Sequence, residues 1–203
     1  KFIGEQIGFL EQKHQEKRYV FGFEESYGYL SGSYVRDKDA VVASMLICEM
    51  AAFYRTKGIS LLQARENMYA KYGVYVHTQK SFTCEGITGM EKMKKLMSHL
   101  REQTPKTIGD LKVTKFADYI ASTVIDIATG AKTKLTLPKS DVLTFTLVDG
   151  ASVVIRPSGT EPKIKAYFTT TGKTQDEAKA LEKKSAEDFT NILEKKKKSL
   201  QFL

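Results

Sequence analysis

Three short stretches between residues 142 and 169 most constrain how this chain can fold. Val142–Val148 alternates apolar and polar residues, as a strand with one buried face does. Asp149-Gly150 is a typical two-residue hairpin turn, and Ser152–Ile155 supplies the returning strand. A further strand is predicted over Ile164–Thr169, and a helix with an apolar stripe begins at Thr174. The pattern predicts a mostly antiparallel sheet covered by a helix.

The residues before this sheet alternate between helical and strand-like patterns. Asp39 and Ser60 are typical amino-terminal helix caps, and Gly58 and Gly73 stand where glycine commonly ends a helix. The alternation predicts an α/β fold with a mixed sheet. The expected elements are strands at Tyr19–Phe23 and Val74–Cys84, and helices over Ala40–Lys57, 60–73 and Gly86–Arg101.

The pattern changes at Gln103–Thr107, where a polar segment containing Pro105 separates helix-rich from strand-rich sequence. We therefore expect two domains, residues 1–103 and residues 104–203. The first is predicted to be α/β, and the second a small α+β domain with a mostly antiparallel sheet.

Composition narrows the class of protein. A chain of 203 residues with 41% hydrophobic and 28% charged residues is typical of a globular protein rather than a disordered one. No apolar run approaches the about 20 residues that cross a bilayer, and no leader pattern is visible, so a cytoplasmic protein without membrane contact is expected.

Cys48 and Cys84 lack metal-ligand spacing, and both are expected to be buried thiols. The formal net charge of +8 suits a polyanionic ligand, either a nucleic acid or a sugar phosphate.

The segment from Arg156 to Thr160 joins two of the predicted strands and combines groups that hold a phosphate. Arginine offers a planar fork of donors, the hydroxyls of Ser158 and Thr160 add more, and Gly159 lets backbone amides approach an anion closely. Lys165 adds positive charge in the next strand. The alternative, from the residues alone, is a polar turn whose arginine forms a surface ion pair.

A second polar segment, from Gly22 to Gly28, follows the first predicted strand and contains Glu24, Glu25 and Ser26. Carboxylates and a hydroxyl on a glycine-flanked turn can bind neighbouring hydroxyls of a sugar. Glu24 and Ser26 are expected to project to the same side of an extended segment, with Glu25 pointing elsewhere. The alternative is a loop whose acids face solvent or cap the next segment.

The string Arg-Pro-Ser-Gly-Thr-Glu-Pro-Lys at residues 156–163, followed by an apolar strand and a final helix, resembles the distal phosphate-binding loop of the alpha-D-phosphohexomutases. The Glu-Glu-Ser segment is similar to that family's sugar-specificity loop. The resemblance implies that the first loop binds the phosphate that is not being transferred, and that the second binds sugar hydroxyls. The residues implied are Arg156, Ser158, Gly159, Thr160 and Lys165 for the phosphate, and Glu24, Ser26 and Lys38 for the sugar, with Arg36 a possible neighbour.

The resemblance also implies an architecture and a reaction. The chain would hold part of the family's third domain and then its fourth domain, which has a TATA-box-binding-protein-like fold. The full-length enzyme would interconvert glucose 1-phosphate and glucose 6-phosphate through a phosphoserine and glucose 1,6-bisphosphate, with Mg²⁺. Mannose or pentose phosphates are alternative substrates, because Phe23 and Tyr27 depart from the commoner pattern around the acids.

The family's Thr-Ala-Ser-His-Asn-Pro-like serine loop and Asp-Gly-Asp-Gly-Asp-Arg-like metal loop do not occur in this sequence. No catalytic or metal-binding residue is therefore expected in the chain, which would be inactive without the amino-terminal domains of a longer polypeptide. An alternative from another class is a nucleic-acid-binding module. The sequence shows no stripe of interleaved aromatic and basic residues to support it, so no nucleic-acid partner is expected.

Overall fold

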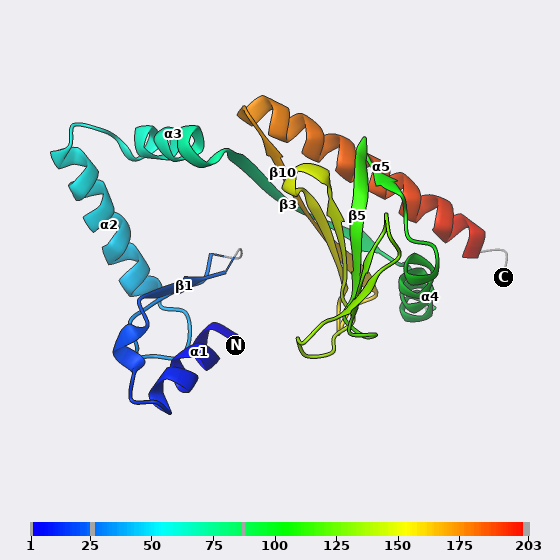
Figure 1. The fold of residues 1–203 in the computed structure, drawn as a ribbon, viewed down its shortest axis with the longest axis horizontal. Helices are drawn as coiled ribbons and strands as arrows, with labels where there is room; N and C mark the ends of the chain where they lie inside the picture. The colour runs from blue at the N-terminus through cyan, green and yellow to red at the C-terminus, as the bar shows by residue number, and fades with distance from the viewer. Residues whose placement is uncertain (1, 25–26, 87, 201–203) are drawn as a thin grey trace. The chain divides into compact units, whose positions relative to one another are not determined.

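The computed structural model describes residues 2–24, 27–86 and 88–200, and the chain divides into two compact units, residues 1–69 and 70–203 (Figure 1). In the first unit, strands β1 (Phe21–Phe23) and β2 (Tyr29–Ser31) pair antiparallel, with Phe23 opposite Tyr29. No described helix has both the length and the apolarity needed to span a bilayer. The elements that begin in the first unit are α1 (Phe2–Glu11), a short 3₁₀ helix (Glu16–Arg18), β1 (Phe21–Phe23), β2 (Tyr29–Ser31), α2 (Ala40–Thr56) and α3 (Leu61–Tyr72).

The predicted helix caps of this unit are confirmed. The Asp39 carboxylate accepts hydrogen bonds from the backbone amides of Val41, at 2.9 Å, and Val42, at 3.2 Å. The Ser60 hydroxyl accepts one from the amide of Gln63 at 3.1 Å. These bonds satisfy amides that have no partner inside the helix, so the start of each helix is fixed by a local contact.

The second unit is built on one eight-stranded sheet. Its main strand order is β3-β10-β9-β8-β5-β6-β7, with β4 paired to β5, and every pairing is antiparallel. The strands are β3 (Val74–Thr83), β4 (Thr107–Ile108), β5 (Leu111–Asp118), β6 (Thr123–Asp126), β7 (Lys132–Lys134), β8 (Leu143–Leu147), β9 (Ser152–Pro157) and β10 (Lys163–Gly172), and the helices are α4 (Gly89–Glu102) and α5 (Gln175–Leu200).

The turn between β8 and β9 follows the prediction from Asp149-Gly150. Both residues have positive φ, 55° for Asp149 and 74° for Gly150. A hairpin turn of this kind matches the right-handed twist of the strands, and aspartate and glycine adopt its backbone angles at little cost. The strand that returns, β9, therefore pairs along both β8 and β10.

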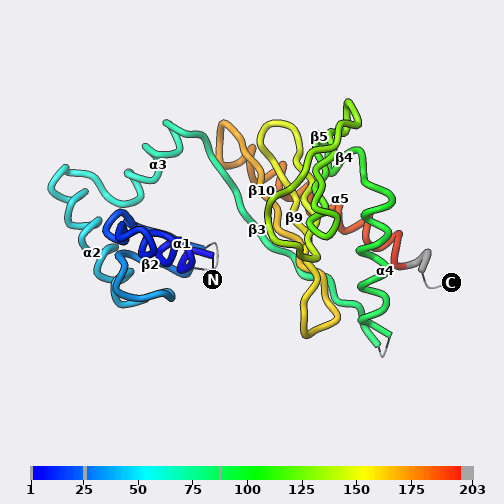
Figure 2. Tube along the Cα trace, turned by 60° about the horizontal axis from the view of Figure 1, so that its bottom comes forward, coloured from blue at the N-terminus to red at the C-terminus, as the bar shows by residue number. Residues whose placement is uncertain are grey.

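Helices α4 and α5 lie on the same side of the strands in the ribbon of Figure 1 and in the Cα tube of Figure 2. Phe189 of α5 is fully buried among aromatic rings from three strands. Its ring centroid lies 6.2 Å from Phe82 of β3, 6.4 Å from Phe145 of β8 and 6.0 Å from Phe168 of β10. The core therefore joins α5 to the sheet, and within the described residues of the second unit no helix covers the opposite face of the sheet.

The predicted fold class is confirmed, and several details of the sequence analysis are corrected. Strands β4, β5, β6 and β7 were not predicted. Cys84 is buried as expected, but Cys48 is exposed because α2 buries none of its side chains. The domain boundary expected after residue 103 stays a prediction. In the structure, β3 and α4 pack with the unit that begins at Ala70.

Candidate functional site

The Arg156 loop, residues 156–163, is a tight connection between β9 and β10. The amide of Ser158 donates to the carbonyl of Lys163 at 2.8 Å, and the amide of Lys163 donates to the carbonyl of Glu161 at 2.7 Å. The Ser158 hydroxyl accepts two longer bonds, from the amides of Thr160 at 3.5 Å and Glu161 at 3.3 Å. Bonds of this length are weak, so the amides of Thr160 and Glu161 can donate to a bound anion instead at a small cost in free energy.

Arg156 and Lys165 stand directly opposite each other in the β9–β10 ladder. Their neighbours Ile155 and Ala166 are buried on the helix-covered side, so the two cations lie on the open face of the sheet. Like charges in directly opposed positions repel. Among the described residues, neither cation forms an ion pair. The pair is therefore an uncompensated positive site that an anion would stabilise.

The remaining residues of the Arg156 loop differ from this pair in charge and exposure. Lys163 is bound to Glu161, Nζ to Oε2, at 2.5 Å, so its charge is already neutralised. A Cβ added to Gly159 would meet no atom within 4 Å, and Thr160 is exposed. The tip of the loop is open, and it leaves room beside the backbone for a ligand. The structure thus brings the five predicted phosphate residues into one turn and two adjoining strands, and their binding role stays a prediction.

The Glu24 loop, residues 22–28, connects β1 to β2. The amide of Glu24 donates to the carbonyl of Gly28 at 2.8 Å, which closes the loop. Tyr27 is exposed and has a φ of 63°, a left-handed conformation that side chains other than glycine and asparagine seldom adopt. Ser26 and its neighbour Glu25 lie outside the described residues, so their expected orientations stay predictions.

Lys38 packs against the Glu24 loop. A Cβ on Gly28 would lie 2.1 Å from Cδ of Lys38 and 3.2 Å from Oε2 of Glu24, so a side chain at this position would displace Lys38 from where it lies. The Lys38 ammonium pairs with Asp37 at 2.8 Å. The hydrogen bond to Asp37, then the charges of Asp37 and Glu24, raise the pKa of Lys38. Two predicted sugar residues, Glu24 and Lys38, are therefore neighbours.

The contacts of Arg36 indicate a structural role and not a substrate-binding one. Its guanidinium pairs with Glu11 of α1 at 2.9 Å and donates to the carbonyl of Ser33 at 2.5 Å. The pair with Glu11 holds the segment before α2 against α1, and the bond to Ser33 is a local contact within that segment. The suggestion that Arg36 reaches a substrate gains no support from this arrangement.

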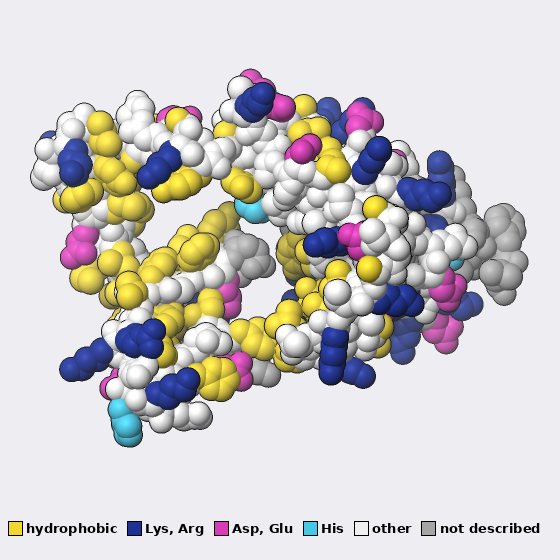
Figure 3. All heavy atoms as spheres, viewed as in Figure 1, with side chains coloured by type: hydrophobic (Ala, Val, Ile, Leu, Met, Phe, Trp, Pro, Cys, Tyr) yellow, Lys and Arg dark blue, Asp and Glu magenta, His cyan; other side chains and the backbone are white. Residues whose placement is uncertain are grey.

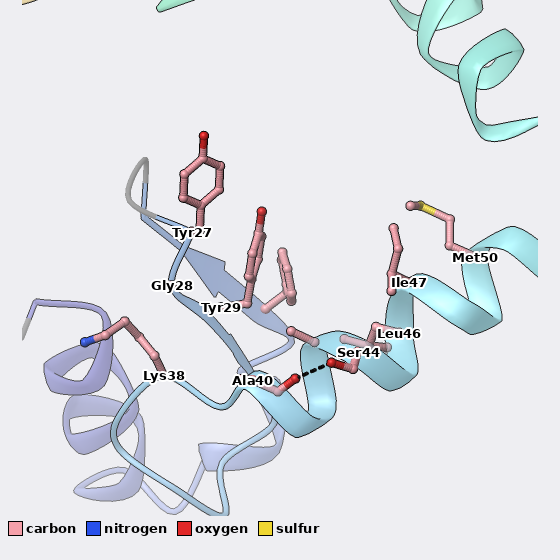
Figure 4. Close-up of a pocket in the computed structure, with 11 residues that line it drawn as sticks. Tyr27, Gly28, Tyr29, Lys38, Ala40, Ser44, Leu46, Ile47 and Met50 are labelled. Carbon is pink, nitrogen blue, oxygen red and sulfur yellow. Dashed lines mark hydrogen bonds between the residues drawn. The ribbon is translucent and has the colours of Figure 1, made fainter. Parts of the chain in front are cut away.

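An apolar groove of about 750 Å³ lies between the β1–β2 hairpin and α2 (Figure 4). Tyr27 and Tyr29 stand along one side of it and Ile47 and Met50 along the other. Lys38 contributes carbon atoms, and its nitrogen points away from the other labelled residues. Figure 3 shows apolar side chains, in yellow, gathered over α2, β1 and β2. The groove is thus too apolar to hold a phosphate, which needs charged donors.

Metal binding has no support in the described part of the chain. No group of three or more histidine, cysteine, aspartate or glutamate side chains gathers there in a way that would hold an ion. The magnesium that the resemblance implies therefore does not fit the described residues, and no step through it is derived from them.

Two family models match this chain. The model of the phosphoglucomutase/phosphomannomutase alpha/beta/alpha domain III covers residues 6–72, and the model of the phosphoglucomutase/phosphomannomutase C-terminal domain covers residues 101–188. The chain belongs to the phosphoglucomutase/phosphomannomutase family. The Arg156 loop falls within the second match and the Glu24 loop within the first.

Curated members of the phosphoglucomutase/phosphomannomutase family support this membership. A phosphoglucomutase of Staphylococcus aureus strain MRSA252 is 40% identical over 169 residues, which is 83% of this chain and 30% of that protein. The phosphoglucomutase of strain MSSA476 is 39% identical over the same shares. The chain thus spans about a third of the length of the curated relatives it matches.

A solved structure extends the family likeness to the fold. The crystal structure of the exocytosis-sensitive phosphoprotein pp63/parafusin, a phosphoglucomutase from Paramecium in its open form, matches with a TM-score of 0.59 at 18% identity. The match covers 98% of this chain and 33% of that one. At this identity the comparison supports the fold alone.

The contacts at the base of the Arg156 loop were not predicted from the sequence. The backbone amide of Cys84 donates to the carbonyl of Pro162 at 2.7 Å, and Gly89 packs against the same proline. The only signal in the sequence was the pair Gly86 and Gly89 at the start of a helix, where glycine is not a preferred helix former.

Proposed function

We propose that this chain binds the sugar phosphate in the reaction of a phosphoglucomutase. Arg156, Ser158, Gly159, Thr160 and Lys165 would hold the phosphate that is not transferred. Glu24, Ser26 and Lys38 would bind the hydroxyls of the sugar. The observation that carries the proposal is the Arg156–Lys165 pair, two directly opposed cations on an open sheet face without an ion pair among the described residues.

The chemistry of the two loops fits this role. A phosphate placed between Arg156 and Lys165 removes their mutual repulsion and accepts charge-assisted hydrogen bonds from both. The carboxylate of Glu24 accepts hydrogen bonds from sugar hydroxyls, and the ammonium of Lys38 donates to sugar or phosphate oxygens. Phosphoryl transfer depends largely on positioning, and fixing both ends of the substrate supplies it.

The proposal extends to the whole enzyme. Its reaction would interconvert glucose 1-phosphate and glucose 6-phosphate through a phosphoserine and glucose 1,6-bisphosphate, in the cytoplasm, with Mg²⁺ supplying charge stabilisation. Mannose or pentose phosphates are the alternative substrates. Because the serine and metal loops of the family do not occur in the sequence, we expect no turnover from the 203-residue chain, with or without Mg²⁺ and the bisphosphate. Turnover by the purified chain would contradict this part of the proposal.

Titration of the 203-residue chain with glucose 1-phosphate, followed by NMR, tests the site. Arg156→Ala should weaken binding by roughly 1.5 to 3 kcal/mol, the cost of one hydrogen bond to a charged group. Lys165→Ala should weaken it as well, whereas Lys132→Ala, which removes an exposed cation from β7, is the matched control. Equal affinity of the wild-type and Arg156→Ala chains would remove Arg156 from the site.

The same titration separates other ligands. Mannose 1-phosphate and ribose 1-phosphate, compared with glucose 1-phosphate, report whether the Glu24 loop selects the sugar. Single-stranded DNA is the probe for the polyanion alternative. Binding to DNA that falls steeply with salt and survives Arg156→Ala would favour that alternative over the sugar phosphate.

A further inference from the structure

The base of the Arg156 loop rests on the end of β3. Thr83, the last residue of β3, stands opposite Lys163, the first residue of β10. One residue further, the amide of Cys84 donates to the carbonyl of Pro162 at 2.7 Å. This bond attaches the loop to a strand outside the β9–β10 hairpin. The position of Pro162 therefore depends on where the backbone of Cys84 lies.

Gly89, the first residue of α4, is packed into this junction. It is buried, and a Cβ added there would lie 2.1 Å from the carbonyl oxygen of Cys84 and 2.9 Å from Cβ of Pro162. Both distances are shorter than van der Waals contact allows, and the first is to a backbone atom. Gly89 does not have a positive φ, so the need for glycine comes from space and not from backbone conformation.

The clash would be relieved by moving the loop and not the helix. Helix α4 is fixed in the core by four side chains that are at most 4% exposed, namely Met93, Leu96, Met97 and Leu100. Close-packed cores resist displacement of this kind. Cys84 is also buried, at 3% exposed, whereas Pro162 lies in a loop, where fewer contacts oppose a shift. A methyl group at position 89 would therefore strain or break the Cys84–Pro162 hydrogen bond.

We infer that Gly89 is a positioning residue for the Arg156 loop: its lack of a side chain lets β3 and α4 hold Pro162 where the loop can bind phosphate. The inference rests on the proposed function, because it assumes that the loop binds an anion. It adds that the affinity of the loop is set in part by α4, a helix that contributes no proposed ligand-binding residue.

The test titrates the 203-residue chain with inorganic phosphate and follows the amide signals of Gly159 and Thr160 by NMR. Gly89→Ala should weaken phosphate binding by about tenfold, as the loss of one charge-assisted hydrogen bond would. Hydrogen exchange of the Cys84 amide should also become faster. Met90→Ala is the matched control, since Met90 follows Gly89 in α4 and its side chain is 39% exposed. It should leave both measurements unchanged.

Affinity and thermal stability separate positioning from a purely structural role. If Gly89→Ala lowers the melting temperature but binds phosphate as the wild type does below that temperature, the inference is wrong. If the variant does not fold, Pro162→Gly replaces it. That change removes the Cβ facing Gly89 and keeps the carbonyl that accepts from Cys84. It should also weaken phosphate binding, and wild-type affinity would overturn the inference.

The Arg156→Ala variant distinguishes this inference from the proposed function. If Arg156→Ala weakens phosphate binding and folded Gly89→Ala does not, only the role of Gly89 fails. If neither change affects binding, or if the wild-type chain does not bind phosphate, the proposed site and the inference fail together.

Discussion

The two units of the chain differ sharply in how many of their apolar side chains are buried. Of the 26 buried apolar side chains among the described residues, only Ile7 and Leu30 belong to residues 1–69, and the other 24 belong to the second unit. The first unit instead exposes many large apolar side chains, among them Val41, Met45 and Phe53 on α2. The difference indicates that a closed core stabilises the second unit, whereas local contacts shape the first.

Those local contacts are visible at each turn of the first unit. Asp39 caps α2, the hydroxyl of Tyr34 donates to Asp39 at 2.5 Å, and Ser60 caps α3. Contacts of this kind fix where a helix starts, but each contributes little free energy compared with burying an aromatic side chain. The comparison therefore predicts that equivalent substitutions have unequal effects in the two units.

The largest difference is expected for phenylalanine. Phe189→Ala removes a fully buried ring that packs on three others, and it should destabilise the second unit by about 3 to 5 kcal/mol. Phe53→Ala, at a ring that is 54% exposed on α2, should change stability by less than about 0.5 kcal/mol. Urea unfolding of both variants measures the difference. Similar midpoints would contradict the idea of a core confined to the second unit.

Breaking an ion pair should also destabilise the second unit more than the first, but by less free energy than the loss of a buried aromatic ring. Arg101 of α4 contacts Asp118, Nε to Oδ2, at 3.3 Å and also binds Asp141, and the side chains of Arg101 and Asp118 are 20% and 12% exposed. Arg101→Ala leaves the Asp118 charge largely desolvated, and a loss of about 2 kcal/mol is expected. Arg65→Ala breaks the exposed pair with Glu66 in α3 and should leave the melting temperature unchanged. A larger shift for Arg65→Ala would reverse the comparison.

The two cysteines give a chemical test. Burial raises the pKa of the Cys84 thiol, so little reactive thiolate forms near pH 8, while Cys48 is exposed. Iodoacetamide should label Cys48 first and Cys84 only after unfolding, as mass spectrometry of digested samples can show. Because the folded pKa is raised, the Cys84 contribution to stability is present below the unfolded value of about 8.5 and is lost as pH rises through the folded value. Cys84→Ala should reduce the loss of stability at high pH.

The smallest effect is expected at the cap of α2. The hydrogen bond from Tyr34, then those from the amides of Val42 and Val41, lower the pKa of Asp39. The stabilisation is therefore present above the unfolded value of about 3.9 and is lost as pH falls through the lower folded value. The amide signals of Val41 and Val42 should shift with a midpoint below that value, and Tyr34→Phe should raise the midpoint. A midpoint at the unfolded value would show that the cap is not formed.

Features governed by near neighbours could be predicted from the sequence. The caps at Asp39 and Ser60 and the turn at Asp149-Gly150 each follow from the chemistry of a few adjacent residues. Strand β7 could not be found by alternation, because all three of its residues are exposed. The burial expected for Cys48 was wrong because an apolar helix sequence does not show whether anything covers the helix.

In the candidate site too, features formed by adjacent residues could be predicted, and contacts between distant residues could not. The Arg156 loop was found as a string of residues, since its donors are consecutive. Pairing with a distant strand was not predictable, because β3 meets β10 across about 90 residues of intervening chain. For the same reason, the contact of Gly89 with Pro162 required the folded structure. The donors of the loop could therefore be predicted from the sequence, but the elements that hold the loop in place could not.

The hydrogen bonds at the base of the Arg156 loop have a consequence for its length. One joins the amide of Ser158 to Lys163 across the hairpin, and the other joins Cys84 to Pro162 from the neighbouring strand. Both acceptors belong to consecutive residues, Pro162 and Lys163, so an additional residue between Ser158 and Pro162 would lengthen the tip and leave both bonds in place. An additional residue between Pro162 and Lys163 would shift one acceptor relative to the other, and one of the two bonds would be lost. The tip of the loop can therefore vary in side chains and in length, whereas its attachment at Pro162 and Lys163 cannot.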